Sequence, residues 1–250
     1  MYIQRNMTPP VVKNLIIANC VALLATELLP MGDDIVERFA LFNVAGPLFR
    51  SYQVFTYMFL HGGVSHLFFN MFALWMFGRQ LEYELGSQRF FTYYMVCGIG
   101  AALLQLGVGY AEFMHSVAET GLQASVRLLA TPTIGASGAV YGLLLAFGVL
   151  HPNNVIMLIF PPIAMKAKWF VVIYGLLELF FGLSGYQAGV AHFAHLGGML
   201  WGLALLYWWR KKRKIFFLRW QIIIVRHTPR ARVVRVVRQE LLLPIWLSVS

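Results

Sequence analysis

The sequence predicts an all-α membrane protein, folded as a bundle of six transmembrane helices. Hydrophobic residues make up 59% of the 250 residues and charged residues only 12%, about half the charged fraction of a typical soluble domain. The hydrophobic residues also gather in six long runs. A run of about 20 apolar residues is long enough to cross a bilayer as a helix, so most of this chain is expected to lie in lipid.

Six apolar segments are the predicted spans, and each is expected to be helical because backbone polar groups in hydrocarbon must bond within their own segment. The spans are predicted at 11–30, 57–78, 90–110, 133–150, 168–184 and 190–209. Two longer connections lie between them, at 31–56 and 111–132. We expect the 31–56 loop to lie partly in the membrane interface.

The distribution of positive charge predicts the orientation of the chain. Of the 20 lysines and arginines, 11 follow Tyr207. If the N-terminus is cytoplasmic, the other inside segments hold six of the remaining cations and the outside loops hold three. Cytoplasmic segments of membrane proteins carry this excess of Lys and Arg. We therefore predict that both termini are cytoplasmic and that the two long connections lie outside.

The net charge of +10 is concentrated towards the C-terminus. A basic cluster at 210–214 directly follows the last span, where cytoplasmic membrane anchors lie, so nucleic-acid binding is not predicted. We divide the chain into a six-helix transmembrane domain, 1–210, and a basic cytoplasmic tail, 211–250. The tail ends in an apolar run, 241–247, that is too short to span. A surface amphipathic helix and a poorly ordered tail are both compatible with this pattern.

Polar side chains occur at one depth in three of the predicted spans. His66 and Asn70 come at the outer start of the second span, and Ser137 follows the outer start of the fourth. His195 lies near the outer start of the sixth. Because polar and ionisable side chains are costly in hydrocarbon, they are functional candidates by default. Their common depth indicates a site below the outer surface, in a topology drawn only from cations and apolar runs.

The fourth span begins with small residues around one hydroxyl. Gly135 and Gly138 flank Ser137, and glycines allow close approach of a backbone or a substrate. A serine near a helix N-terminus also lies beside free backbone N–H groups, which can stabilise an oxyanion. Such a string by itself is more often a helix-packing face with an incidental serine, so the catalytic interpretation needs a base.

The sixth span supplies a histidine for that role. Histidine titrates near neutral pH and can activate a serine within hydrogen-bond reach. Gly198 and Gly202 form a Gly-xxx-Gly face that favours tight helix packing, and His195 lies three residues before Gly198, close to that face. If the partner helix carries Ser137, serine and imidazole form a dyad.

No carboxylate is assigned as a third member of this site. Glu27 and Glu178 lie in predicted spans, and we interpret both as packing or interface residues, which favours a dyad over a triad. A metal centre is a second interpretation, because His192 and His195 are spaced i, i+3. The His-Glu-x-x-His signature is missing and no carboxylate is expected beside the histidines, so no metal is predicted.

The second span carries a pair of candidate hydrogen-bond donors. His66 and Asn70 are spaced i, i+4 and therefore share one helical face. An imidazole N–H and an amide N–H that point the same way can donate to an oxyanion. Hydrogen bonding to neighbouring helices is the alternative role and, for two such residues alone, the more frequent one.

Four motifs occur in order, each on its own span or loop. They read HGGVSHLFFN at 61–70, LEYELGS at 81–87, GASG at 135–138 with Tyr141, and AHLGG at 194–198 with Gly202. Through these motifs, and over about residues 50–205, the chain resembles a bacterial rhomboid protease. All four motifs together, in this order, make the resemblance specific.

The resemblance implies a role for each matching residue. It makes Ser137 the nucleophile and His195 its base, with His66 and Asn70 as oxyanion-stabilising residues. Tyr141 matches the aromatic residue that packs on the catalytic imidazole. The other matching positions are implied to support the structure or the glycine motifs around the site, and they are His61, Glu82, Gly135 and Gly198.

The first outer loop departs from the family pattern. Family members often carry a Trp-Arg pair just before the second span. Here residues 51–56 read SYQVFT, and the only nearby arginine is Arg50. Details of the first loop are therefore not carried over from the family, while the dyad is unaffected.

The implied function is that of a rhomboid serine endopeptidase, which hydrolyses peptide bonds in or near transmembrane segments of membrane protein substrates. It requires no metal and no organic cofactor. Because hydrolysis consumes water, we expect the rhomboid-like bundle to enclose a water-accessible cavity open to the outer side. The expected location is a bacterial inner (cell) membrane, as a multi-pass protein in contact with lipid and substrate, and no oligomeric state is assigned.

Two other classes of function remain as alternatives. A catalytically silent rhomboid-like protein would bind membrane clients without cutting them, but such proteins usually lack the serine or the histidine that this chain has. A small transporter or channel would use the histidines as a proton relay. The absence of acid pairs in the spans and of internal repeats in the sequence disfavours it.

Overall fold

The computed structural model describes residues 7–157, 162–184 and 190–226, with side chains up to residue 212. The chain divides into two compact units, Met1–Trp208 and Trp209–Ser250, and the site described below lies in the first. Within the predicted tail, residues 211–226 continue the last helix, while 227–250 lie outside the described residues. The domain boundary at 210 and the cytoplasmic location of the tail stay predictions.

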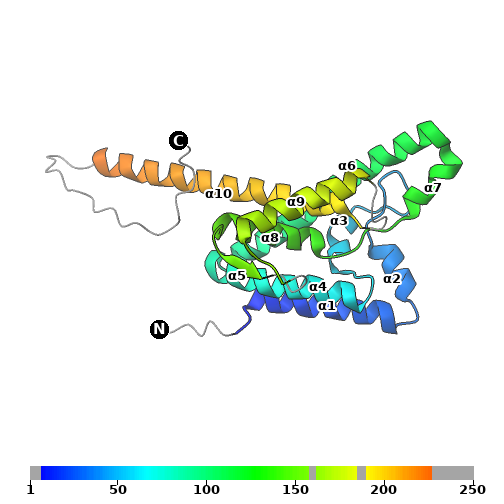
Figure 1. Ribbon diagram of the computed structural model, residues 1–250, viewed down its shortest axis with the longest axis horizontal. Helices are drawn as coiled ribbons and strands as arrows, with labels where there is room; N and C mark the ends of the chain where they lie inside the picture. The colour runs from blue at the N-terminus through cyan, green and yellow to red at the C-terminus, as the bar shows by residue number, and fades with distance from the viewer. Residues whose placement is uncertain (1–6, 158–161, 185–189, 227–250) are drawn as a thin grey trace. The chain divides into compact units, whose positions relative to one another are not determined.

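Helices make up most of the described chain (Figure 1). Their bounds are α1 Pro10–Leu28, α2 Gly32–Phe39, α3 Gln53–Thr56, η1 Tyr57–Phe59, α4 Val64–Ala73, the π-helical turn η2 Leu74–Gly78, α5 Arg79–Leu85, α6 Ser87–Thr120, α7 Leu122–Ala130, α8 Ser137–Leu150, α9 Ala167–Ser184 and α10 His192–Arg226. A short antiparallel pair that the sequence did not predict, β1 Val155–Met157 and β2 Ala164–Lys166, lies between α8 and α9.

The predicted all-α membrane fold is confirmed. Among the described residues, α1, α6 and α9 are long and apolar enough to cross a membrane, and α8 is a shorter apolar helix. Figure 1 shows α8 in the middle of the bundle, with α1 and α4 on one side and α9 on the other. Ten of the 14 residues of α8 are buried, so this helix forms much of the core. The count of six spans stays a prediction.

Two segments differ from the sequence prediction. The predicted second span, 57–78, is not one continuous helix, because Gly63 adopts a φ of 106° between η1 and α4. The predicted outer connection, 111–132, is largely helical: α6 continues to Thr120 and α7 follows after Gly121. The hydroxyls of Ser116 and Ser125, 2.8 Å apart, link α6 to α7, so this segment folds on itself.

Glycines bring α6, α8 and α10 into close contact. A Cβ on Gly198 of α10 would lie 1.8 Å from the carbonyl oxygen of Gly138 of α8. A Cβ on Gly142 would lie 2.4 Å from the sulfur of Cys97 of α6. Because real Cβ atoms cannot approach other atoms so closely, only glycine fits there. The structure therefore shows α10 packed on the helix that carries Ser137.

Glu82 joins the start of α1 to the start of α6. Its buried carboxylate accepts hydrogen bonds from the backbone N–H groups of Val11, at 3.0 Å, and Val12, at 2.8 Å. The same carboxylate accepts a bond of 2.7 Å from the Ser87 hydroxyl. N–H groups in the first turn of a helix have no partner within the helix and favour a negative charge. Glu82 thus has a structural role, as the resemblance implies.

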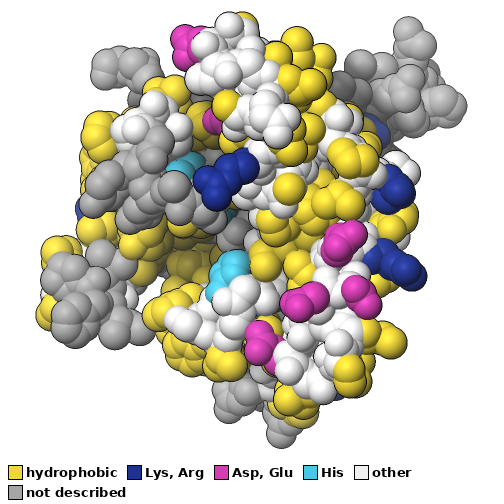
Figure 2. Space-filling model, turned by 90° about the vertical axis from the view of Figure 1, so that its right-hand side faces the viewer, with side chains coloured by type: hydrophobic (Ala, Val, Ile, Leu, Met, Phe, Trp, Pro, Cys, Tyr) yellow, Lys and Arg dark blue, Asp and Glu magenta, His cyan; other side chains and the backbone are white. Residues whose placement is uncertain are grey.

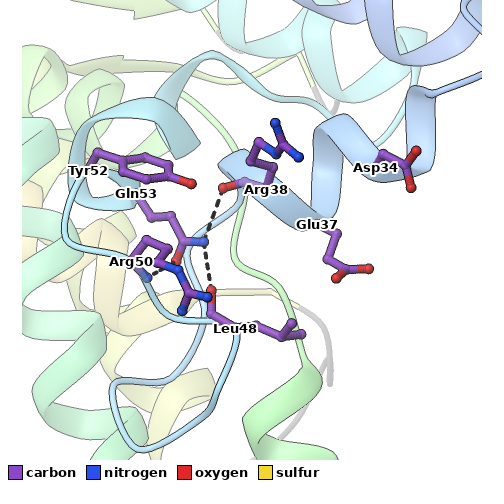
Figure 3. Close-up of a pocket in the computed structure, with 7 residues that line it drawn as sticks. All are labelled: Asp34, Glu37, Arg38, Leu48, Arg50, Tyr52 and Gln53. Atoms are coloured by element: carbon purple, nitrogen blue, oxygen red, sulfur yellow. Dashed lines mark hydrogen bonds between the residues drawn. The ribbon is translucent and has the colours of Figure 1, made fainter.

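Gln53 organises the first loop, where the family's Trp-Arg pair is missing. Its buried amide nitrogen donates to the carbonyl oxygens of Arg38 and Leu48, and its oxygen accepts from the N–H of Arg50 (Figure 3). The loop lies against a surface pocket of about 550 Å³, lined by Asp34, Glu37, Arg38, Leu48, Arg50, Tyr52 and Gln53. A neutral amide therefore holds this loop together through backbone hydrogen bonds.

The contact between Gly198 and Gly138 predicts that the effect of one added methyl group on stability depends strongly on its position. Gly198→Ala places a Cβ against backbone that cannot move as a side chain does, and we expect it to destabilise the fold by about 1–3 kcal/mol. Gly107→Ala is the matched control, because a Cβ there meets nothing within 4 Å, and alanine favours a helix over glycine by up to about 1 kcal/mol. Thermal unfolding of both variants in the same detergent provides the measurement. Equal melting temperatures would show that the α8–α10 contact is not needed.

Candidate active site

Ser137 is the first residue of α8. The chain enters the helix through Gly135, whose φ of 128° lies in a region that favours glycine, and the Gly135 N–H donates to the Tyr57 carbonyl at 3.0 Å. The N–H groups of the first helical turn have no acceptor within the helix. The serine hydroxyl therefore lies beside backbone donors and the positive end of the helix dipole.

His195 lies within hydrogen-bond distance of the serine. Its Nε2 is 2.8 Å from the Ser137 Oγ. His195 is buried and Ser137 is half-buried. The two residues belong to α10 and α8, which meet at Gly198 and Gly138, so the close glycine packing sets the distance between them. The structure thus brings together the two residues that the sequence analysis paired.

Tyr141 lies flat against the base. Its ring stacks on the His195 imidazole with the ring centres 4.2 Å apart and the planes inclined by 7°. Tyr141 lies one helical turn after Ser137 in α8, so both side chains reach the same imidazole from one helix. The stacking restricts rotation of the ring while leaving its Nε2 edge on the serine.

Glu178 of α9 lies against the histidines, and here the sequence interpretation was wrong. Its Oε2 is 2.9 Å from the Nδ1 of His195 and 2.7 Å from the Nδ1 of His192. The Tyr141 hydroxyl donates to its Oε1. The sequence analysis treated Glu178 as a packing or interface residue and expected no carboxylate beside the histidines. One feature of the sequence could have indicated this contact. An ionisable residue in an apolar span is usually paired with another polar group.

Glu27, the other acid in a predicted span, is placed differently. It is exposed on α1, which agrees with an interface position. The contrast shows why the sequence alone treated the two acids alike. Both interrupt apolar runs, and only the packing of α9 against α10 separates a buried, paired carboxylate from an exposed one.

Glu178, His192 and His195 are also a set of metal-ligand types whose atoms lie within 4.8 Å of one another. The two imidazole nitrogens approach one carboxylate oxygen at 2.7 and 2.9 Å, which are hydrogen-bond distances. Donor atoms around a tetrahedral zinc ion with bonds of 2.0–2.1 Å lie roughly 3.3 Å apart. The distances between the imidazole nitrogens and the carboxylate oxygen are therefore those of groups that share a hydrogen, and they are too short for ligands of one zinc ion. The metal-free mechanism stays a prediction.

His66 lies beside the segment that leads into Ser137. A Cβ on Gly135 would lie 3.0 Å from the His66 Nε2 and 3.6 Å from the Ser137 Oγ. The Gly62 N–H donates to the His66 Nδ1 at 3.2 Å, so neutral His66 carries its proton on Nε2. That arrangement presents an N–H donor next to the serine.

Asn70 and His61 surround His66. The Asn70 amide nitrogen donates to the His66 carbonyl at 3.0 Å, one turn along α4. The His61 ring lies edge-on to the His66 ring, with centres 5.0 Å apart, and its Nδ1 is 3.3 Å from the Phe59 carbonyl. Both residues are buried. Of this group, His66 is the residue whose ring lies against Gly135, two residues before Ser137.

Figure 2 shows a hollow in one face of the molecule, with histidine side chains at its edges and hydrophobic side chains around it. The half-buried state of Ser137 and His66 is compatible with access from such a hollow. The polar pocket of Figure 3 is a separate feature, because none of the predicted site residues lines it. The water-accessible cavity at the dyad stays a prediction.

Known proteins share the region that contains the site. Rhomboid protein 1, mitochondrial, of Saccharomyces cerevisiae is 32% identical over 151 residues, which cover 60% of this chain and 39% of that protein. The rhomboid protease AarA of Providencia stuartii is 31% identical over 147 residues, covering 58% and 51%. The rhomboid protease GluP of Bacillus subtilis is 28% identical over 151 residues, covering 60% and 24%. The chain therefore matches about half or less of the length of these relatives.

Residues 49–212 match the family described as the Rhomboid domain. This range covers most of the chain and holds every predicted site residue, from His61 to Gly198. It also holds α8, α9 and the start of α10, which carry the contacts of the site. The chain belongs to the rhomboid family.

Proposed function

We propose that this protein is an intramembrane serine protease that uses Ser137 as nucleophile and His195 as general base. The single observation that carries the proposal is the 2.8 Å contact between the His195 Nε2 and the Ser137 Oγ. A serine is a weak nucleophile until an adjacent base can accept its proton. Relatives named as rhomboid proteases support the same reaction class.

In the first half of the reaction, the Ser137 Oγ attacks the carbonyl carbon of the scissile peptide bond and the His195 Nε2 takes the hydroxyl proton. The tetrahedral intermediate collapses, and His195 gives that proton to the leaving amine. The product is an acyl-enzyme ester on Ser137. In the second half, His195 takes a proton from water as the water oxygen attacks the ester carbonyl. The second tetrahedral intermediate then collapses, His195 returns the proton to the Ser137 Oγ, and the carboxyl product leaves.

The oxyanion of each tetrahedral intermediate would lie between α8 and α4. The free N–H groups at the start of α8 can donate from one side, and the Nε2–H of His66 can donate from the other. Asn70 is proposed as a second side-chain donor, and in the resting structure its amide bonds to the His66 carbonyl. Donors fixed in advance stabilise charge as it develops, without reorganising water.

The proposed substrates are transmembrane segments of other proteins. The dyad lies among helices that form an all-α membrane fold, so a substrate segment would reach it from lipid or along the membrane surface. We propose a bacterial inner (cell) membrane as the location, because the motifs resemble those of bacterial rhomboid proteases. The cation distribution supports an orientation with both termini cytoplasmic. The expected chemistry uses only side chains and water.

Removal of either member of the dyad is expected to abolish covalent labelling by a fluorophosphonate serine-hydrolase reagent. Ser137→Ala deletes the attacked oxygen, and His195→Ala leaves the serine without a base. Gel fluorescence of the purified proteins in detergent measures the labelling, and thermal unfolding checks that each variant is folded. Labelling that persists in a folded Ser137→Ala variant would contradict the assignment. A folded wild-type protein that stays unlabelled in several detergents and lipids would favour the silent, client-binding class.

Loss of an oxyanion donor is expected to slow the acylation step without removing it. His66→Ala and Asn70→Ala should each lower the labelling rate, with His66→Ala in the range of about 10²–10³-fold that one donor typically contributes. His115→Ala is a matched control, because His115 is an exposed histidine on α6 that contacts Glu119. The rate constants come from labelling time courses. Changes below about threefold in both site variants would assign His66 and Asn70 to helix packing instead.

A further inference from the structure

We propose that Glu178 is a positioning residue, whose carboxylate holds His195 in the tautomer and orientation that accept the Ser137 proton. The inference rests on the proposed function and deepens it, because it adds a third side chain that acts through the base. The structure joins three helices at this point, since Glu178 lies on α9, His195 on α10 and Ser137 on α8.

The chemistry of the carboxylate favours one tautomer. An ionised carboxylate only accepts hydrogen bonds, so a nitrogen 2.9 Å from its Oε2 is more stable with a hydrogen than with a lone pair. The proton of neutral His195 then lies on Nδ1. Its Nε2 is left with the lone pair, and Nε2 is the atom 2.8 Å from the Ser137 hydroxyl. In the other tautomer an N–H would face the serine and could not take its proton.

Two further contacts hold the carboxylate in place. The Nδ1 of His192 lies 2.7 Å from the same Oε2, and the Tyr141 hydroxyl donates to Oε1. Tyr141 also stacks on His195, so one tyrosine supports both the base and its proposed partner. Within the described residues, the other ring nitrogen of His192 is buried without a hydrogen-bond partner. The Nδ1 of His192 thus bonds to Glu178 although its Nε2 has no partner. An unsatisfied buried polar atom is costly in a protein interior.

The contact between Glu178 and His195 is short but not yet aligned. The N–H direction of His195 does not meet Oε2 at an angle suited to a hydrogen bond, although the atoms are 2.9 Å apart. Catalytic hydrogen bonds are often poorly aligned in a resting enzyme and tighten in the complex. When His195 takes the serine proton it becomes a cation beside a buried carboxylate, and their attraction is stronger there than in water. The carboxylate would therefore stabilise the charged state that forms during the reaction.

A purely structural role for Glu178 is the competing explanation. Burial of a carboxylate is unfavourable unless it is paired, and this one has two hydrogen bonds and the close contact with His195. Glu178→Gln separates the two roles because it keeps the size and an acceptor oxygen but removes the charge. Its amide NH₂ can also donate to the His195 Nδ1, which would favour the unproductive tautomer.

The test compares fluorophosphonate labelling of the wild-type protein with Glu178→Gln, at several reagent concentrations. The maximal rate should fall by about 10²-fold or more, because the corresponding acid-to-amide change in a Ser-His-Asp triad costs about 10⁴-fold. The concentration for half-maximal rate and the melting temperature should change little. Glu27→Gln is the matched control, since Glu27 is an exposed acid on α1, and its rate should stay within about twofold of wild type. A Glu178→Gln rate within about threefold of wild type would overturn the proposal and leave the dyad intact.

A second measurement is made on the unmodified protein, and a variant serves only to assign one signal. Nitrogen-15 NMR of histidine-labelled protein in lipid reports which ring nitrogen carries the proton, with the His195 signal identified by its loss in His195→Gln. Protonation of Nδ1 is expected, and a neutral His195 protonated on Nε2 would overturn the proposal. A wild-type protein that does not react with the fluorophosphonate would instead count against the proposed protease function. The tautomer of His195 would still decide the role of Glu178.

Discussion

The close approach of α8 and α10 is the constraint on which the site depends. At Gly138 and Gly198 the two backbones are so near that no side chain fits between them. One turn before Gly198, this approach places the His195 imidazole 2.8 Å from the Ser137 hydroxyl. The site is therefore built on two helices of a packed core rather than on flexible loops, which favours a fixed distance between nucleophile and base. The same glycines that look like simple packing residues in the sequence thus determine the geometry of the proposed reaction.

A second physical theme is that the two buried acids, Glu82 and Glu178, are paired with groups on other helices. Polar groups in an apolar interior are costly alone and tolerable in hydrogen-bonded sets. Glu178 lies with Tyr141 and two histidines, and Glu82 accepts from backbone N–H groups and a serine. The two acids have different consequences, because Glu82 fixes helix ends while Glu178 contacts the base. The contacts of Glu82 support the fold, and we connect the contacts of Glu178 to the reaction.

The sequence predicted the membrane class, the approximate position of most helices and the pairing of Ser137 with His195, because apolar length and glycine spacing are local signals. It did not predict the contact of Glu178 with His195. That contact depends on the rotation of α9 about its axis and on its packing against α10, which no short-range pattern records. Likewise, the helical form of most of 111–132 and the β1–β2 pair were missed, since a composition with mixed polar and apolar residues predicts a connection as readily as an element. The role of Gln53 follows from four loop hydrogen bonds that are visible only in three dimensions.

The central claim is that Ser137 is an activated nucleophile within an apolar helix bundle. The most direct measurement is tandem mass spectrometry of the protein after reaction with a fluorophosphonate, to locate the adduct along the chain. The account predicts one phosphonylated residue, Ser137, in the peptide that starts α8. Modification of a different serine, or a folded and unmodified protein under conditions in which a control serine hydrolase reacts, would contradict it.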